Sequence, residues 1–123
     1  AHIRDGVAVS RFLRWLEGAA PAGGLTEAAV ADKLRGFREE TGALRDLSFD
    51  TISAAAGNAA SPHYRFDPAA SAALPTQGIY LVDSGGQYDD GTTDITRTVA
   101  IGEPTAEMRR RFTQVLKGHI ALA

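Results

Sequence analysis

The sequence predicts one domain of mixed α+β (or α/β) architecture. Three observations lead to this prediction. Apolar residues recur with helical spacing near both ends of the chain, and short segments in the middle alternate or cluster as β-strands do. The chain has 123 residues, 44% of them hydrophobic, which is close to the commonest size of a single domain.

Two helices are predicted in the first third of the chain. From Ile3 to Leu16 the apolar residues form a broad helical face: Ile3, Val7, Val9, Phe12, Leu13 and Leu16. The segment Pro21 to Gly24 ends this helix. Thr26 is the predicted N-cap of the second helix, and Gly42 fits its C-terminal end. The apolar stripe of this second helix consists of Val30, Leu34 and Phe37.

Strands are predicted in the middle of the chain, and a helix after them. The segment "RDLSFDTIS" (45–53) alternates apolar and polar residues as a strand does, and a small-residue, irregular connection follows it. "IYLVD" (79–83) and "TTDITRTVAI" (92–101) form the two arms of a predicted hairpin. Pro104 ends the sheet and Thr105 is the predicted N-cap of the last helix. Its apolar face consists of Met108, Phe112, Val115, Leu116 and Ile120.

Composition and charge exclude several classes of function. The formal net charge is −2, which gives no electrostatic basis for binding nucleic acid or an anionic membrane. No apolar run approaches the ~18 residues that a membrane-spanning helix needs. The chain has no cysteine, so disulfides and thiolate metal sites are excluded, and a cytoplasmic location is expected.

The two ends of the sequence indicate a piece of a longer polypeptide. The chain does not begin with Met, and its first residues already follow a helical pattern. Its last residues, "RRRFTQVLKGHIALA" (109–123), are helical in pattern too, without a terminating Gly or Pro. We therefore expect residues 1–123 to be a partial domain, truncated at both ends.

Asp83 and Asp94 are candidate metal ligands. Both fall on predicted strands, where the hairpin would bring their carboxylates close together. A hairpin centred on Tyr88 and Asp89 places the two aspartates directly opposite each other, with their side chains on one face. Like charges in this position are destabilising, whereas a divalent cation removes the repulsion and needs close oxygen ligands. Two such carboxylates can also hold two metal ions ~3.5–4 Å apart. The alternative is that Asp83 starts a turn and Asp94 is an exposed edge residue.

The segment "YLVDSGGQYDDGTTDITRTVAIGEPT" (80–105) resembles the first metal-ligand segment of aminopeptidase P, the Xaa-Pro aminopeptidases. The resemblance rests on Asp-x-Gly at 83–85, a second aspartate at 94 and Thr-Arg-Thr at 96–98. It extends over nearly the whole chain, with "HIRDGVAV" (2–9) and "DLSFDTIS" (46–53) before this segment and "FTQVLKGHIALA" (112–123) after it. These enzymes are pita-bread metallopeptidases.

The resemblance implies the first half of a pita-bread fold in the catalytic domain of a metallopeptidase. Such an enzyme uses two divalent metal ions, usually manganese, and releases the first residue of peptides that have proline second. Asp83 and Asp94 match the two aspartate ligands, with Asp94 bridging the metals. His63 matches a histidine that lines the substrate pocket near the scissile amide, so it is the candidate for substrate binding and catalysis.

The resemblance also implies that the site is incomplete in this chain. The family's remaining ligands, one His and two Glu, lie further along the polypeptide than residue 123, so we expect the isolated chain to be inactive. Half of the fold leaves a sheet edge and an apolar face uncovered, which predicts self-association into a homo-oligomer. The alternative function is that of a non-catalytic pita-bread relative that binds peptides or protein partners.

Overall fold

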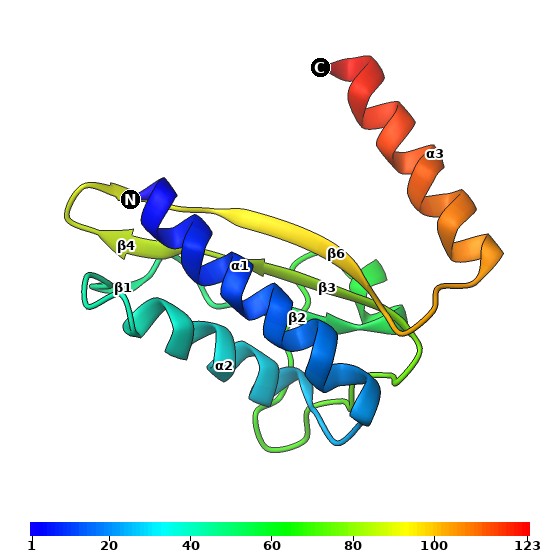
Figure 1. The fold of residues 1–123 in the computed structure, drawn as a ribbon, viewed down its shortest axis with the longest axis horizontal. Coiled ribbons are helices and arrows are strands. Elements are labelled where there is room, and N and C mark those ends of the chain that lie inside the picture. The colour runs from blue at the N-terminus through cyan, green and yellow to red at the C-terminus, as the bar shows by residue number, and fades with distance from the viewer.

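The computed structural model describes residues 1–123 and contains three α-helices, two 3-10 helices and six strands (Figure 1). In chain order these elements are α1 (His2–Ala19), η1 (Ala20–Ala22), α2 (Glu27–Glu39), β1 (Asp46–Leu47), β2 (Ile52–Ala55), η2 (Ala56–Ala60), β3 (Gly78–Ser84), β4 (Gly86–Tyr88), β5 (Gly91–Thr92), β6 (Ile95–Ile101) and α3 (Ala106–Leu122).

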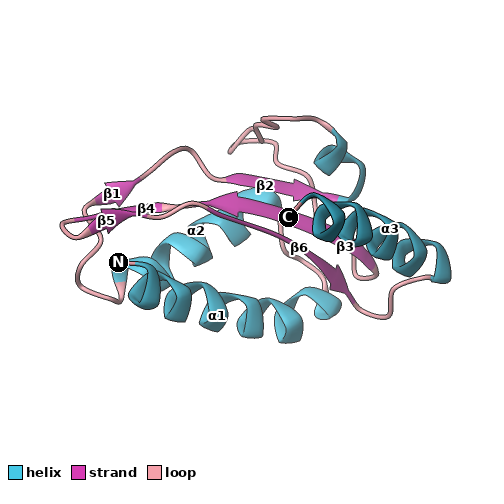
Figure 2. Ribbon diagram, turned by 90° about the horizontal axis from the view of Figure 1, so that it is seen from above, coloured by secondary structure: helices cyan, strands magenta, loops and turns pink.

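Helices α1 and α2 cover one face of the antiparallel sheet β2-β3-β6 (Figure 2). Side chains alternate along β3, so Tyr80 and Val82 point into the core between sheet and helices. Leu81 and Asp83 point to the opposite face, which we call the outer face. The helices contribute most of the remaining core residues: Val9, Phe12, Leu16, Val30 and Leu34.

The predicted hairpin is present, but it is longer than the predicted arms. Strand β3 pairs with β6, and β4 pairs with β5 in the same register, as Ser84↔Ile95 and Gln87↔Thr92 show. The two ladders are separated at Gly85. A β-carbon at this position would lie 1.9 Å from the Thr93 carbonyl oxygen and 2.2 Å from Ser48 Oγ. Only glycine fits this junction.

The helix ends confirm the predicted signals. The Thr26 hydroxyl accepts a hydrogen bond from the Ala29 amide at 3.2 Å and so caps α2. Gly42 has the positive φ of 67° expected where the chain leaves α2. At the third helix, Thr105 Oγ1 likewise accepts from the Met108 amide at 3.2 Å.

The prediction of one strand over residues 45–53 was wrong. Strands β1 and β2 belong to different sheets, β1 pairing with β4 and β2 with β3. Between them Ser48 donates its amide to the Gly85 carbonyl and its hydroxyl to the Thr93 carbonyl. The segment 45–53 lies beside the hairpin and bends at Ser48, next to Gly85, where the two ladders of the hairpin are separated.

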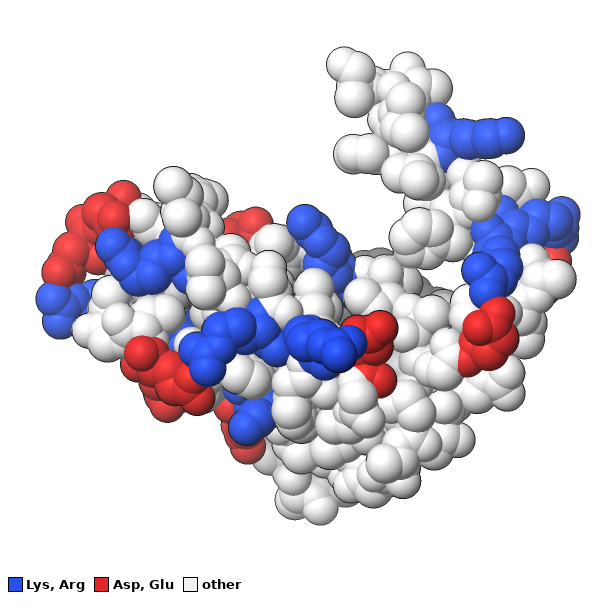
Figure 3. Space-filling model, in the orientation of Figure 1, with Lys and Arg blue, Asp and Glu red and all other residues white.

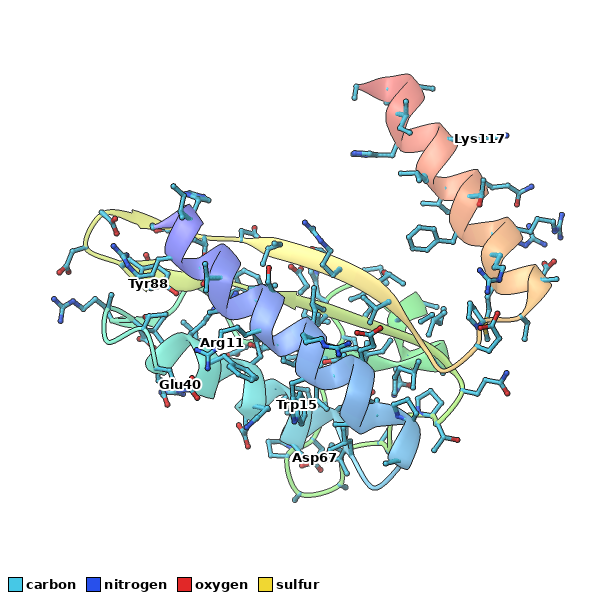
Figure 4. All side chains as sticks on the ribbon, in the orientation of Figure 1. Arg11, Trp15, Glu40, Asp67, Tyr88 and Lys117 are labelled. Atoms are coloured by element: carbon cyan, nitrogen blue, oxygen red, sulfur yellow. The ribbon has the colours of Figure 1, made fainter.

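The apolar face predicted for the first helix is only partly buried. Val9, Phe12 and Leu16 are buried, but Ile3 is 88% exposed and Val7 is 57% exposed. Instead, the first turns of α1 bury Asp5, whose Oδ1 accepts hydrogen bonds from Arg38 Nε at 2.7 Å and from the Tyr88 hydroxyl at 2.7 Å. This contact orients the start of α1 against the hairpin, next to Tyr88 (Figure 4).

Helix α3 projects from the rest of the molecule and buries none of its residues (Figure 1). Between α3 and strands β3 and β6 lies a groove of about 810 Å³, whose lining includes Ile79, Phe112 and Val115. The charged side chains of α3 lie mostly away from this hollow (Figure 3), and Lys117 points outward (Figure 4). The apolar face predicted for this helix is therefore present but uncovered.

Helix length and polarity also bear on membranes. None of the three helices combines the length and the apolar character required to cross a bilayer.

Candidate functional site

The three residues that the sequence singled out line one cavity on the outer face of the sheet. Asp83 lies in β3, Asp94 immediately precedes β6, and His63 lies in the connection after η2. The cavity has a volume of about 300 Å³. Its lining residues are Phe49, Asp50, Ile52, His63, Arg65, Asp83 and Asp94.

The predicted pairing of Asp83 with Asp94 was wrong by two residues. Across the ladder Asp83 faces Thr96, because the hairpin turns at Asp89 and Asp90 rather than about Tyr88 and Asp89. A shift of two residues keeps Asp94 on the same face as Asp83, since side chains alternate with period two. Diagonal neighbours of this kind are ~7–8 Å apart. The repulsion between the two carboxylates is therefore weaker than in the predicted arrangement.

Both aspartates at the hairpin tip are paired with cations. Asp89 accepts hydrogen bonds from Arg45, and Asp90 accepts them from Arg4 and from the N-terminal amino group of Ala1. Hydrogen bonds and charge from these cations lower the pKa values of both aspartates. Both tip aspartates are thus engaged with cations, so neither is available to the cavity. They differ in this respect from Asp83 and Asp94.

The two cavity aspartates have different surroundings. Asp83 is half-buried, lies opposite Ile52 of β2, and accepts a hydrogen bond from the Thr96 hydroxyl at 2.7 Å. Asp94 is exposed, and its carboxylate makes no hydrogen bond or ion pair within the chain. The Thr96 contact orients the Asp83 carboxylate while leaving its second oxygen free. Together the pair offers oxygen ligands of the type that hard divalent cations prefer.

His63 occupies a strained position in the turn Ser61–Tyr64. The Tyr64 amide donates to the Ser61 carbonyl at 3.2 Å, and His63 has a φ of 56°. Proline at the second position and positive φ at the third are features of a type II turn, where glycine is the usual third residue. A histidine in this region costs ~1–3 kcal/mol. The imidazole is exposed and has no hydrogen-bond partner within the chain.

The structure adds Asp50 and Arg65 to the cavity, and no sequence pattern pointed to either. The two side chains form an ion pair at the cavity rim, and both are more than 70% exposed. Arg65 follows His63 by two residues in an irregular connection, where neither spacing nor periodicity distinguishes it from any exposed charge. The pair makes the cavity rim polar on the side of His63.

A divalent metal fits the donors present only in part. The structure contains no group of three or more His, Cys, Asp or Glu side chains close enough to hold one ion. Asp83 and Asp94 provide oxygen ligands, but two carboxylates alone bind such cations weakly, because affinity follows ligand number and rigidity. A metal ion held firmly here would therefore need further ligands.

The sequence profile of metallopeptidase family M24 matches residues 1–123. Over 123 residues the chain is 50% identical to the "Probable Xaa-Pro aminopeptidase P" of Laccaria bicolor, a match covering 99% of the chain and 19% of that protein. Over 123 residues it is also 47% identical to aminopeptidase P2 of Arabidopsis thaliana, covering 99% of the chain and 17% of that protein. The chain thus spans about one fifth of these relatives' length.

Two solved structures show the same fold over nearly the whole chain. The X-prolyl aminopeptidase of Caenorhabditis elegans superposes with a TM-score of 0.88 at 43% identity, covering 97% of this chain and 20% of that one. It is described as a cytosolic enzyme with a di-nuclear active site. The X-Pro aminopeptidase of Thermotoga maritima superposes with a TM-score of 0.79 at 26% identity, covering 95% of this chain and 31% of that one. The α+β fold is therefore that of part of a pita-bread aminopeptidase P structure.

Proposed function

The chain belongs to metallopeptidase family M24 as a homologue of Xaa-Pro aminopeptidase P, and we propose that it forms part of a metal-dependent aminopeptidase. The proposed reaction releases the N-terminal residue from peptides with proline at the second position. The observation that carries the proposal is the single cavity shared by His63, Asp83 and Asp94. Residues from three separate segments converge there, on the face of the sheet that no core residue occupies.

In this proposal Asp83 and Asp94 are ligands of two divalent metal ions, with manganese as the expected metal. Bound metals of this kind generate hydroxide at neutral pH and polarise the carbonyl of the scissile peptide bond. Asp94 is the expected bridging ligand, which agrees with its exposed carboxylate having no partner in the chain. Thr96 orients the Asp83 carboxylate through its hydroxyl.

His63 is the proposed substrate-binding and catalytic residue. Its ring borders the cavity of the two aspartates, where a peptide bound near the metals would lie. A histidine in this position can hydrogen-bond the peptide and stabilise charge that develops at the scissile amide. Because neither ring nitrogen is engaged within the chain, both are available for that contact.

The isolated chain is proposed to be inactive. The two carboxylates lack the further ligands needed to hold metals firmly, and the relatives are about five times longer than the matched region. A polypeptide of the relatives' length that carries this chain should hydrolyse a tripeptide with proline second in the presence of Mn²⁺. The same tripeptide with alanine second should be a poor substrate. Loss of this selectivity, or full activity after Asp94→Asn, would count against the proposal.

A non-catalytic role in binding peptides or protein partners is the second candidate. The groove between α3 and the sheet favours it, since an apolar helix face lies uncovered there. The pair Asp83 and Asp94 supports the enzyme instead, because peptide binding alone does not require two aspartates on one face of a hairpin. Metal-independent peptide binding by the Asp94→Asn variant, without hydrolysis by the unmodified protein, would favour the second candidate.

The uncovered groove also leads us to propose that the isolated chain forms a homodimer or a higher oligomer. Phe112, Val115 and Leu116 are 52%, 73% and 45% exposed on one face of α3. Burial of these side chains against a second copy stabilises the assembly. Light scattering tests this proposal, and a monomer at high protein concentration would contradict it.

A cytoplasmic location is proposed on two grounds. The chain has no cysteine, and the nematode enzyme of the same fold is described as cytosolic. Fluorescence microscopy of the tagged full-length protein tests this location.

A further inference from the structure

Glu27 is a buried carboxylate that has no cationic partner. The residue is 0% exposed and lies in the first turn of α2. Three donors satisfy it: the Ala55 amide (2.8 Å) and Asn58 Nδ2 (2.9 Å) bond Oε1, and the Tyr64 hydroxyl (2.9 Å) bonds Oε2. The N-terminus of α2 adds a favourable field for the negative charge. A buried carboxylate held by neutral donors is costly enough to require an explanation.

The three donors belong to one segment that runs from the end of β2 to Tyr64. Within this segment lie the only two residues other than glycine that have a positive φ, Ala56 at 48° and His63 at 56°. Such positions persist only where the surrounding contacts hold them. The Glu27 side chain provides those contacts at both ends of the segment, by way of Ala55 and Tyr64.

We propose that Glu27 is a positioning residue for His63, acting through Tyr64; this inference rests on the function proposed for His63. The Tyr64 hydroxyl donates to Glu27 and accepts from Asn58 Nδ2 at 3.0 Å, so the ring is fixed at its polar end. The Tyr64 amide closes the turn that contains His63. Because the imidazole has no partner of its own, the direction in which it projects depends on this anchored turn.

The contact between Tyr64 and Glu27 favours the protonated phenol. The hydrogen bond to Glu27 raises the pKa of the Tyr64 hydroxyl above its ordinary value, as expected for a phenol that donates to a carboxylate. The backbone of Glu27 is held by a second contact. Ser53 Oγ donates to the Glu27 backbone carbonyl at 2.7 Å, and the same hydroxyl is 2.7 Å from the Tyr80 hydroxyl.

A purely structural role for this network makes a different prediction from a positioning role. Tyr64→Phe removes the link between Glu27 and the turn and leaves the contacts of Ala55 and Asn58 with Glu27 in place. Tyr80→Phe is the matched control, because it removes another tyrosine hydroxyl in the same network without touching residues 56–64. If the network only stabilises the fold, both variants should leave His63 unchanged.

NMR spectroscopy of the isotopically labelled chain tests the proposal in two steps. Without metal, the intraresidue NOE between the amide and α-protons of His63 reports whether its positive φ is retained, because these two protons lie closer together at positive φ than in the usual backbone regions. With Mn²⁺, paramagnetic broadening of the His63 ring protons is compared with that of the Asp83 and Asp94 amides, which report metal binding itself. In Tyr64→Phe we expect a weakened intraresidue NOE, and His63 ring broadening reduced at least twofold relative to unchanged amide broadening. The original chain and Tyr80→Phe should keep both signals.

The proposal is overturned if Tyr64→Phe leaves the intraresidue NOE and the ring broadening of His63 as they are in the original chain. Absence of amide broadening at Asp83 and Asp94 in the original chain would instead contradict the proposed metal site. The NOE measured without metal would still decide the role of Glu27 in that case. Glu27→Gln is the second variant, and the same change in the His63 NOE is expected because an amide offers one acceptor oxygen where the carboxylate offers two.

Discussion

Asp83 faces Thr96 across the β3–β6 ladder, and the Thr96 hydroxyl donates to its Oδ1 at 2.7 Å. This pairing places Asp94 two residues away on the same face, so both carboxylates border the cavity that also contains His63. The register of the hairpin therefore determines whether the candidate site exists. Changes that disturb the register should disturb the site, and changes elsewhere should not.

Gly85 is the position at which the hairpin register is most sensitive to substitution. In Gly85→Ala the new methyl group would overlap the Thr93 carbonyl and Ser48 Oγ, so we expect a loss of stability of ~3 kcal/mol or more. Urea denaturation measures this loss. Gly36→Ala is the matched control, because nothing lies within 4 Å of its new methyl group. There the helix propensity of alanine should raise stability by up to ~1 kcal/mol. Equal effects of the two substitutions would contradict the proposed role of Gly85.

The buried pair Asp5 and Arg38 should contribute far more than any exposed ion pair. Their side chains are 3% and 0% exposed, so Asp5→Ala leaves a guanidinium uncompensated in the core. The expected loss in the free energy of unfolding is ~3–5 kcal/mol. Glu17→Ala removes a pair whose side chains are 69% and 82% exposed, and it should cost less than ~1 kcal/mol. Urea denaturation of both variants compares these losses, and similar values would contradict this account.

All three tyrosines should resist ionisation in the folded chain. Burial, followed by the hydrogen bond to Asp5, raises the pKa of Tyr88 to about 12, burial raises that of Tyr80, and the Glu27 contact raises that of Tyr64. A raised folded pKa stabilises the fold below the unfolded value of ~10, and this stabilisation is lost as pH rises through the folded value. Near-ultraviolet absorbance of the folded chain should therefore show that Tyr80 and Tyr88 do not ionise at pH ~10, whereas in urea all three tyrosines should ionise there. A step at that pH larger than the signal of one tyrosine, before unfolding, would contradict the prediction.

Sequence patterns predicted the elements better than their pairing. Caps such as Thr26, the apolar stripes and the hairpin arms are local signals, so the three helices and the two strands β3 and β6 could be predicted from sequence. The turn centre could not be, because the pairing of the whole ladder determines it, as Asp83↔Thr96 and Gln87↔Thr92 show. The division of residues 45–53 into two strands depends on Gly85, nearly forty positions away, and so has no local signature.

The residues of the candidate site also differ in how far the sequence could predict them. Asp83, Asp94 and His63 could be selected from motif resemblance, and the structure brings all three to one cavity. Asp50 and Arg65 at its rim are ordinary exposed charges in the sequence. In the sequence, Glu27 is an ordinary acidic residue in the first turn of a helix. Only its burial and its three hydrogen-bond donors in the structure distinguish it.

The central claim is that Asp83 and Asp94 act together as metal ligands, and calorimetric titration with Mn²⁺ tests it most directly. We expect weak, saturable binding by the chain, with a Kd of ~0.1–1 mM, because two carboxylates are only part of a site. Asp94→Ala should abolish the binding heat, whereas Asp32→Ala, which removes an exposed aspartate from α2, should leave it unchanged. Identical isotherms for the chain and for Asp94→Ala would contradict the claim.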